Sequence, residues 1–565
     1  MRHFTIIILL FSTSIFFGQK KYPTKYFRNP LDIKTILAGT FGELRGNHFH
    51  AGLDIKTQEK EGLNVFAAAD GYVSRIKVAL WGYGKVIYVT HPNGYTTVYA
   101  HLSKFGKGIE EYVKAIQYKK ESYETGNIFL KPNQISVKKG DVIAYSGSTG
   151  GFVAPHLHYE IRDTKTEKII NPLLFGVKVK DTIAPKIKGL FVYPLVDSSR
   201  VNQSIKKSLL AFKSVGNNTY TTNRITANGP IGFGVQVTDQ LNGAYNKNGI
   251  YSLEMIVNGH KVYHHELETF SFAESKYINL LIDYENYARF KNRFQKTYKE
   301  KASKLKIYKE LLNDGIVSIK TGFDYRVEII AADFEGNKTI IRIPVKGIQS
   351  NTVFRKEKDT TAYKIIANRF NKFKQNGVSV AFPKNTFYND LYLDFKVKNN
   401  IAEIHNTRIA LDKNYTLTFD VSKYSEDEKN QLYIAGINNK KYPSYQNTRK
   451  KDDTFFTTTK TLGNYTLLSD KQKPTVLLSN FKNKQWITKY SEIIVKIEDK
   501  KSGIKSYRAT LDGEWILMEY NLKTKQLIYQ FKDKKLVGSK HLLEIEVEDN
   551  VGNTNTLSAT FYKKE

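Results

Sequence analysis

The stretch Gly84–Leu102, "GKVIYVTHPNGYTTVYAHL", has the pattern of a β-hairpin. Two runs rich in Val, Ile, Tyr and Thr flank a Pro-Asn-Gly segment, and Asn and Gly tolerate the positive φ angles that tight hairpin turns require. Short alternating runs recur along all 565 residues, and an aromatic content of 13% favours strands over helical bundles. We therefore predict a mainly β protein.

The chain is too long for one hydrophobic core, and its length suggests about three to five domains. Beyond Val177, three sequence patterns occur twice in the same order, which indicates two copies of one fold. The paired patterns are "DTIAPKIKGL" from Asp181 with "DKQKPTVLLS" from Asp470, "VQVTDQLNGAYNKNGIYSLEMIVNG" from Val235 with "VKIEDKKSGIKSYRATLDG" from Val495, and "YRVEIIAADFEGNKT" from Tyr325 with "LLEIEVEDNVGNTNT" from Leu542.

Short strands separated by Asp, Gly and Asn turns are typical of immunoglobulin-like or fibronectin-like β-sandwiches. We predict a first domain over 28–177, with a surface insertion at 105–137 that includes a helix, and a β-sandwich over 181–350. A basic stretch at 277–312 within that sandwich has helical spacing and is expected to be a helical insertion. A β-rich domain over 351–469 follows, and 470–565 should repeat the 181–350 sandwich.

The first 18 residues have the layout of a secretory signal peptide, with a positive charge at Arg2 followed by an apolar run from Phe4 to Phe17. An uncleaved membrane anchor is the alternative. We expect an exported protein of the periplasm, cell envelope or extracellular space. No later run is long and apolar enough to span a bilayer, so the mature chain should have no transmembrane segment. The chain has no cysteine, which excludes disulfides and thiolate metal ligands.

The formal net charge of +32 is spread along the chain. Such a charge favours polyanionic partners, but export argues against nucleic acid, and no nucleic-acid recognition motif is visible. Anionic polymers of the cell envelope are possible partners. A lysine-rich solvated surface explains the charge equally well.

Two histidines stand one residue apart in "PHLHYEIRD", where His156 and His158 should point to the same face of a strand. Upstream, "NHFHAGLDI" supplies His50 and Asp54, with Gly52 between them to let the backbone bend. Two imidazoles and one carboxylate form a zinc-compatible set that leaves a fourth position for water. Taken alone, the His50 and Asp54 pair could equally be structural, and a pair such as His156 and His158 is more commonly just part of a surface.

A zinc-bound water also needs a general base and a group that stabilises the developing oxyanion. The second histidine of the pair can serve as the base, and His101 can serve as the stabilising group. His101 follows Tyr95, Thr97 and Tyr99 at alternate positions, so we expect these four side chains to share one face that lines a groove.

Four elements of the chain occur in the order found in lysostaphin/LytM-type zinc metallopeptidases, which cleave peptide cross-links of bacterial peptidoglycan. They are "HAGLD", "GYGKVIYVTHPNGYTTVYAHLS", "VKKGDVIAYSGSTG" and "PHLHYEIRD". The region between Phe41 and Phe175 thus resembles this family. The resemblance implies an antiparallel-β peptidase domain that binds one zinc ion through His50, Asp54 and His158. It also implies that His156 acts as the base and that His101 stabilises the transition state.

The sequence departs from the family in the long 105–137 insertion, which we expect to reshape one wall of the groove. The leading hypothesis is an exported zinc endopeptidase that hydrolyses peptide cross-links of peptidoglycan. The alternatives are a catalytically inactive LytM-like activator of cell-wall hydrolases and a structural or adhesive surface protein.

Overall fold

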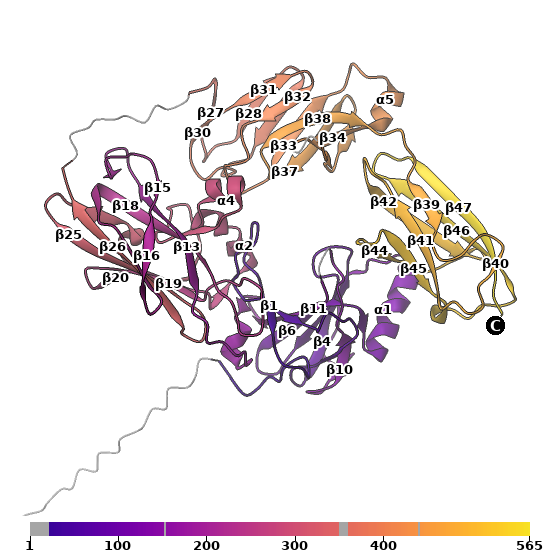
Figure 1. Cartoon of the computed structure of the whole chain (residues 1–565). Helices are drawn as coiled ribbons and strands as arrows, with labels where there is room; N and C mark the ends of the chain where they lie inside the picture. Colours follow the sequence, from indigo (N-terminus) through magenta and orange to yellow (C-terminus); the bar gives the residue numbers. More distant parts are fainter. Residues whose placement is uncertain (1–21, 152–153, 350–359, 439–440, 565) are drawn as a thin grey trace, which may run out of the picture.

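The computed structural model describes residues 22–151, 154–349, 360–438 and 441–564. The predicted signal peptide, 1–18, lies outside this range. The protein is mainly β, as predicted, and its domains are arranged as a ring in which the C-terminal domain returns to the N-terminal one (Figure 1). Within the described ranges, no helix combines the length and apolar character needed to cross a membrane.

The N-terminal domain is built on an antiparallel sheet with the order β1-β2-β11-β6-β5-β4-β8, and a small sheet of order β3-β10-β7 stands beside it. The predicted hairpin is confirmed as β5 and β6. The strands are β1 (Leu37–Gly39), β2 (Leu53–Lys56), β3 (Asn64–Phe66), β4 (Gly71–Val78), β5 (Lys85–Thr90), β6 (Tyr95–Leu102), β7 (Lys104–Phe105), β8 (Gly126–Phe129), β9 (Ser136–Val137), β10 (Val142–Tyr145), β11 (His156–Asp163) and β12 (Ile169–Ile170); a 3₁₀ helix spans Pro172–Phe175.

The predicted helix in the 105–137 insertion is confirmed as α1 (Lys107–Lys120). Ile109, Val113 and Gln117 are buried at intervals of four residues, which places them on one face of the helix. The helix ends where Glu121 adopts a left-handed conformation. Strand β8 then pairs with β4 and extends the main sheet, so the insertion adds a helix and an edge strand to the domain.

The second domain holds long paired strands around its own hydrophobic core. Its strands are β13 (Lys186–Pro194), β14 (Arg200–Val201), β15 (Ser208–Leu209), β16 (Phe212–Gly216), β17 (Thr219–Thr222), β18 (Ile225–Thr238), β19 (Ser252–Val257), β20 (His260–Glu266), β21 (Thr269–Phe270), β22 (Phe294–Lys296), β23 (Tyr308–Leu311), β24 (Val317–Ile319), β25 (Asp324–Ala332) and β26 (Lys338–Gly347). Its helices are α2 (Phe272–Ser275), α3 (Ile278–Leu281) and α4 (Tyr284–Phe290), with a 3₁₀ segment at Leu312–Gly315.

The expectation of a helical insertion over 277–312 is wrong for most of its length. Only α3 and α4 are helical, and the rest includes the strands β22 and β23. Strand β22 pairs with the long strand β18, and β23 pairs with β20. The open edges of these two strands offer backbone hydrogen bonds, and this pairing overrides the helical spacing of the local sequence.

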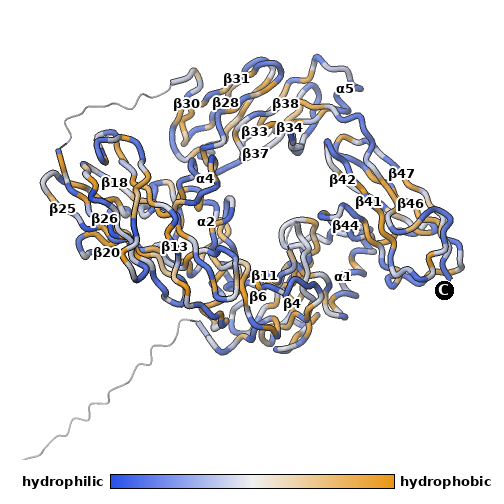
Figure 2. Tube along the Cα trace, viewed as in Figure 1, coloured by the Kyte–Doolittle hydropathy of each residue, from blue (hydrophilic) through white to orange (hydrophobic). Residues whose placement is uncertain are grey.

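The third domain places two five-stranded sheets and one two-stranded sheet around one core, and the fourth places a four-stranded and a five-stranded sheet around another. In β46, exposed and buried residues alternate along the strand, and the alternation of hydrophilic and hydrophobic residues is visible along the traces in Figure 2. The third domain contains β27 (Tyr363–Ile365), β28 (Asn371–Gln375), β29 (Val378–Phe382), β30 (Leu391–Leu393), β31 (Phe395–Lys398), β32 (Ile401–Ile404), β33 (Tyr415–Asp420), α5 (Glu426–Gln431), β34 (Leu432–Gly436), β35 (Ser444–Tyr445), β36 (Arg449–Lys451), β37 (Thr454–Thr459) and β38 (Gly463–Ser469). The fourth contains β39 (Thr475–Leu478), β40 (Gln485–Trp486), β41 (Glu492–Glu498), β42 (Ile504–Leu511), β43 (Glu514–Trp515), β44 (Glu519–Asn521), β45 (Gln526–Gln530), a 3₁₀ turn at Phe531–Asp533, β46 (Lys540–Asp549) and β47 (Thr554–Tyr562).

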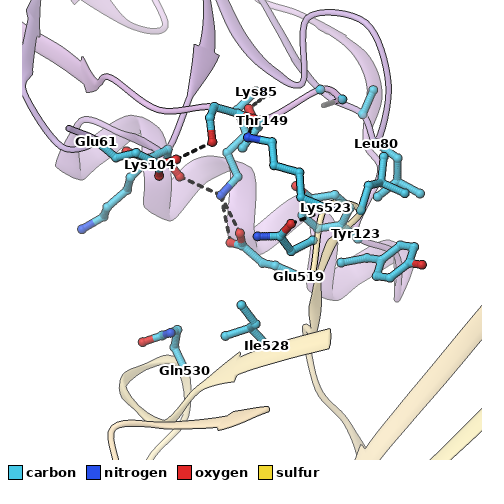
Figure 3. Close-up of a pocket in the computed structure, with 18 of the residues that line it drawn as sticks. Glu61, Leu80, Lys85, Lys104, Tyr123, Thr149, Glu519, Lys523, Ile528 and Gln530 are labelled. Carbon is cyan, nitrogen blue, oxygen red and sulfur yellow. Dashed lines mark hydrogen bonds and ion pairs between the residues drawn. The ribbon is translucent and has the colours of Figure 1, made fainter. Parts of the chain in front are cut away.

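The ring closes where the fourth domain contacts the N-terminal one, around a pocket of about 320 Å³ (Figure 3). Lys85 is 4% exposed, and its Nζ donates to both carboxylate oxygens of Glu519, at 2.9 and 2.8 Å. Beside the pocket, Lys114 forms an ion pair with Asp533 at 2.5 Å. Burial lowers the pKa of Lys85, but Glu519 more than offsets this and raises it, so the ammonium group stays charged.

One hydrophobic core spans the first two domains. Strand β12 pairs with β21 of the second domain, and the Phe270 ring packs against Phe41 and Phe49, with centroids 4.8 and 5.2 Å apart. Ile278 and further apolar residues of the second domain are buried in the same cluster. The first domain therefore buries part of its apolar surface only when the second is present.

We expect a fragment comprising residues 22–177 to aggregate or to unfold at a lower temperature than a fragment comprising 22–349. Each large apolar side chain returned to water costs about 1.5–3 kcal/mol, and the shorter fragment exposes several. Size-exclusion chromatography and thermal unfolding followed by circular dichroism would compare the two. A monodisperse short fragment with an unchanged melting temperature would contradict a shared core.

Candidate metal centre and catalytic groove

Adjacent strands of the main sheet place the candidate metal ligands on one face. Asp54 on β2 lies directly opposite His158 on β11, and β11 also pairs with β6. Because residues directly opposite each other in an antiparallel pair point to the same side, the two side chains meet. His50 precedes β2 in a loop, where its backbone exchanges hydrogen bonds with Glu43 and Gly42.

Three acceptor atoms converge at this face. His50 Nε2 lies 3.0 Å from Asp54 Oδ1 and 3.1 Å from His158 Nδ1, and His158 Nδ1 lies 2.9 Å from the same Asp54 oxygen. The structure thus brings together all three sequence-predicted ligands, and all three residues are buried. Four-coordinate zinc has bonds of about 2.0–2.2 Å to such atoms, so its ligands lie slightly more than about 3 Å apart.

The second nitrogen of each imidazole has a partner that defines the tautomer. His50 Nδ1 donates to the carbonyl oxygen of Thr40 at 2.8 Å, and His158 Nε2 donates to Glu160 Oε1 at 2.9 Å. Each ring therefore directs a lone pair at Asp54 Oδ1 when it is neutral. Three acceptor atoms that face one another repel unless a cation lies among them. Two imidazole nitrogens and one carboxylate oxygen are a ligand set that fits zinc.

Glu160 is fully buried beneath the site. Burial raises its pKa, but Arg162, His158 and a hydrogen bond from Tyr83 lower it to about 2, so the carboxylate stays charged. Burial likewise lowers the pKa of His158, and the bonds to Asp54 and Glu160 reverse this and raise it to about 9. The site therefore favours a positive charge next to His158, supplied by a proton or a metal ion.

His156 and His101 lie beside the three acceptors. His156 Nε2 is 3.5 Å from Asp54 Oδ1. The imidazole rings of His156 and His101 have centroids 4.7 Å apart. His156 Nδ1 donates to the carbonyl of Ala154 at 2.7 Å, and His101 Nδ1 donates to that of Thr149 at 2.8 Å. Each ring therefore keeps Nε2 as an acceptor while it is neutral. Burial, with a smaller effect of His158 and His156, lowers the pKa of His101 to about 3.

The expectation that His101 shares a face with Tyr95, Thr97 and Tyr99 is wrong. Thr97 and Tyr99 are fully buried, and the Tyr99 ring packs against Tyr159 on the opposite side of the sheet from His158. Ile87 lies opposite Tyr99 but Lys85 lies opposite Leu102, so β6 carries one extra residue. His101 has a φ of 61° at this bulge, which turns its side chain towards His156.

Gly52 serves a different purpose from the one predicted. Its φ angle lies outside the left-handed region, so no special bend depends on it. A Cβ atom at this position would lie 2.3 Å from the carbonyl oxygen of Tyr159 and 2.9 Å from Glu160 Cγ. Glycine is therefore needed for the close approach of the chain before β2 to β11, which brings Asp54 to His158.

The acceptors and both further histidines line a groove of about 1260 Å³. The second domain contributes Asn246 and Phe272 to its wall, and Phe272 is 49% exposed. Among the residues that the structure describes, none of the 105–137 insertion lines this groove, so the expectation that the insertion reshapes a wall is wrong. The insertion faces the ring closure instead, where Tyr118 packs against Trp515.

Sequence reasoning missed Glu160 and Arg162. A signal was available, since His156, His158, Glu160 and Arg162 alternate along β11 and must share a face. Polar residues at alternate positions usually mark a solvated face, whereas here the face is covered. The Arg162 guanidinium lies 4.8 Å from the ring of Phe272, which belongs to the second domain.

Comparisons with known proteins identify the family of the N-terminal domain. The model of peptidase family M23 matches residues 48–118, which include His50, Asp54 and His101, and the Zu5-like domain model matches 362–470. The DD-carboxypeptidase/endopeptidase Mpg of Neisseria meningitidis is 34% identical over 113 residues, 20% of this chain and 20% of that protein. An uncharacterized metalloprotease of Haemophilus influenzae is 36% identical over 124 residues, 22% and 20% of the two chains.

The murein hydrolase activator NlpD of Escherichia coli is 32% identical over 153 residues, which are 27% of this chain and 32% of that protein. The chain thus spans about a fifth of the length of the first curated relatives and about a third of the activator. The similarity concerns the N-terminal domain. That domain, with its buried His-Asp-His set in an open groove, is a peptidase family M23 domain of the LytM/lysostaphin type.

Proposed function

We propose that this protein is an exported zinc endopeptidase that hydrolyses the peptide cross-links of bacterial peptidoglycan. The observation that carries the proposal is the convergence of His50 Nε2, Asp54 Oδ1 and His158 Nδ1 within 3.1 Å in a groove that also holds His156 and His101. The similarity to Mpg, whose name states carboxypeptidase and endopeptidase activity, supports it.

The five side chains have separate tasks in this proposal. His50, Asp54 and His158 hold the zinc ion, and bound zinc lowers the pKa of a water molecule and polarises the amide carbonyl. His156 accepts a proton at Nε2, because its Nδ1 hydrogen is donated to Ala154. His101 is neutral in the resting site, with Nδ1–H donated to Thr149, and its role is to stabilise developing negative charge, which favours a proton on Nε2 as the charge forms next to it.

An activator without peptidase activity is the second candidate, and the similarity to NlpD favours it. The complete set of ligands and neighbouring histidines argues for catalysis. Incubating the zinc-loaded chain with purified muropeptides and weighing the products separates the two. Cleaved peptide bonds support the peptidase, whereas no cleavage combined with stimulation of a separate cell-wall hydrolase supports the activator.

We expect His156→Ala to retain zinc and to lose about 10²–10⁴-fold in turnover, because it removes a positioned base and leaves three ligands in place. His50→Ala should lose both zinc and activity, because two ligands compete poorly with water. Metal analysis and muropeptide hydrolysis on the same preparations test both. A zinc-free His156→Ala protein beside a zinc-loaded His50→Ala protein would reverse the assignment of roles.

We expect Glu160→Gln to weaken zinc binding by about 10–100-fold, as is typical for loss of the group that orients a metal-bound histidine. The amide keeps the shape of the side chain but removes the charge that His158 Nε2–H faces. Competition with a zinc chelator measures the affinity, and Glu111→Gln on the exposed face of α1 is the control. Equal affinities in the two variants would show that Glu160 has no part in the metal site.

A further inference from the structure

Three aspartates meet in each of the two repeated domains. In the second domain they are Asp181, Asp239 and Asp333, and in the fourth they are Asp470, Asp499 and Asp549. In each set one carboxylate oxygen per residue lies within 4.8 Å of the other two. The two sets occupy the same places in the three duplicated patterns. The first aspartate begins the first pattern, the second follows the strand that opens the second pattern, and the third begins the Asp-x-x-Gly-Asn turn of the third pattern.

The hydrogen bonds around the two sets also match. Asn337 Nδ2 donates to Asp333 Oδ2, and Asn553 Nδ2 donates to Asp549 Oδ2, both at 2.7 Å. The first aspartate of each set accepts from the backbone two residues later, at 3.0 Å in both domains. The fold thus builds the same arrangement of carboxylates twice.

These carboxylates accept hydrogen bonds from neighbouring N–H groups but have no salt-bridge partner in the described part of the chain. Among the described residues, none of the six forms an ion pair with lysine or arginine. Asp239 and Asp333 are each 4% exposed, and Asp470 and Asp549 are fully buried. Burial and the neighbouring carboxylates raise the pKa of Asp239 to about 7. Buried negative charge of this kind needs a counter-ion.

A fourth buried polar residue neighbours each set, and its side chain lacks a hydrogen-bond partner. Asn248 is 3% exposed, and neither atom of its side-chain amide has a hydrogen-bond partner. It lies directly opposite Asp239 in an antiparallel bridge, so its side chain projects from the same face. Asp239 Oδ1 also lacks a partner.

The equivalent position in the fourth domain is Ser502, since each residue directly precedes a Gly-Ile pair in the duplicated pattern. Ser502 is 1% exposed, and its Oγ atom likewise lacks a partner. Its backbone N–H donates to Asp470 Oδ2 at 3.0 Å, which places the residue at the cluster. Two buried side-chain oxygens without a hydrogen-bond partner, at one repeated position, indicate a missing ligand.

We propose that each repeated domain binds one calcium ion, through Asp181, Asp239, Asn248 and Asp333 in the second domain and through Asp470, Asp499, Ser502 and Asp549 in the fourth. All these side chains offer oxygen, which selects hard cations over zinc. A cavity of about 30 Å³ beside the first set has room for an ion. Calcium suits the irregular set better than magnesium, which demands octahedral geometry.

Both sites lie at domain junctions. The cavity at the first set is also lined by Thr40 and Asn171 of the peptidase domain. In the second set, Asp470 immediately follows the last strand of the third domain, and its N–H donates to Gln431 O at 2.9 Å. Calcium at these positions ties the sandwich domains to their neighbours and thereby stabilises the ring.

Isothermal titration calorimetry on the full mature chain, stripped of metal and then loaded with zinc, tests the proposal with calcium chloride as the probe. We expect two calcium ions per chain, one in Asp239→Asn, one in Asp499→Asn and none in the double variant. Asp427→Asn, an exposed carboxylate on α5, is the control and should keep both. Excess calcium should raise the melting temperature of the wild type by about 5 °C and leave that of the double variant unchanged.

Wild-type protein that binds no calcium at millimolar concentration would overturn the proposal. So would a double variant that is folded by circular dichroism and still binds two ions. Tighter binding of magnesium than of calcium in a competition titration would overturn the choice of cation. These outcomes are independent of the zinc site, because the measured quantity is calcium bound to a zinc-loaded chain.

Discussion

The pairing of β11 with β2 is the constraint on which the site depends. Asp54 and His158 meet because they are directly opposite each other, and Gly52 permits the close approach before β2. A slip of one residue would turn every side chain of β11 to the other face. His156, His158, Glu160 and Arg162 would then enter the core, where Tyr159 now packs. One register therefore specifies both the candidate metal ligands and the hydrophobic core.

A second constraint links the site to the ring. His101 reaches the groove only because of the bulge in β6, and Thr149 holds its ring. The neighbouring residue, Ser148, accepts a hydrogen bond at its carbonyl oxygen from Lys523 of the fourth domain, at 3.1 Å. The adjacent residues Ser148 and Thr149 thus contact the fourth domain and the groove histidine His101, respectively.

The second domain also takes part in the groove. Phe272 contributes to the groove wall and covers Arg162, whose guanidinium lies next to Glu160, and Phe270 packs into the core shared with the peptidase domain. The peptidase fold therefore completes its charged buried layer with side chains from a neighbouring sandwich. Because the ion pair of Glu160 and Arg162 is buried, removal of either partner would leave an uncompensated charge in the layer.

The sequence by itself determined the features that depend on local periodicity. The β5–β6 hairpin follows from its turn residues, helix α1 from helical spacing, and the shared face of His156 and His158 from alternation along a strand. The choice of His50, Asp54 and His158 as candidate ligands came from the resemblance to a known peptidase family. Tertiary structure alone decided the strand β22 in place of a helix, the direction of His101 and the burial of Glu160. Strand β22 forms because the distant strand β18 offers backbone hydrogen bonds. His101 turns because β6 has one extra residue relative to its partner strand, and Glu160 is buried because another surface covers its polar face. No local pattern carries that information, because it is a property of contacts between segments far apart in the chain.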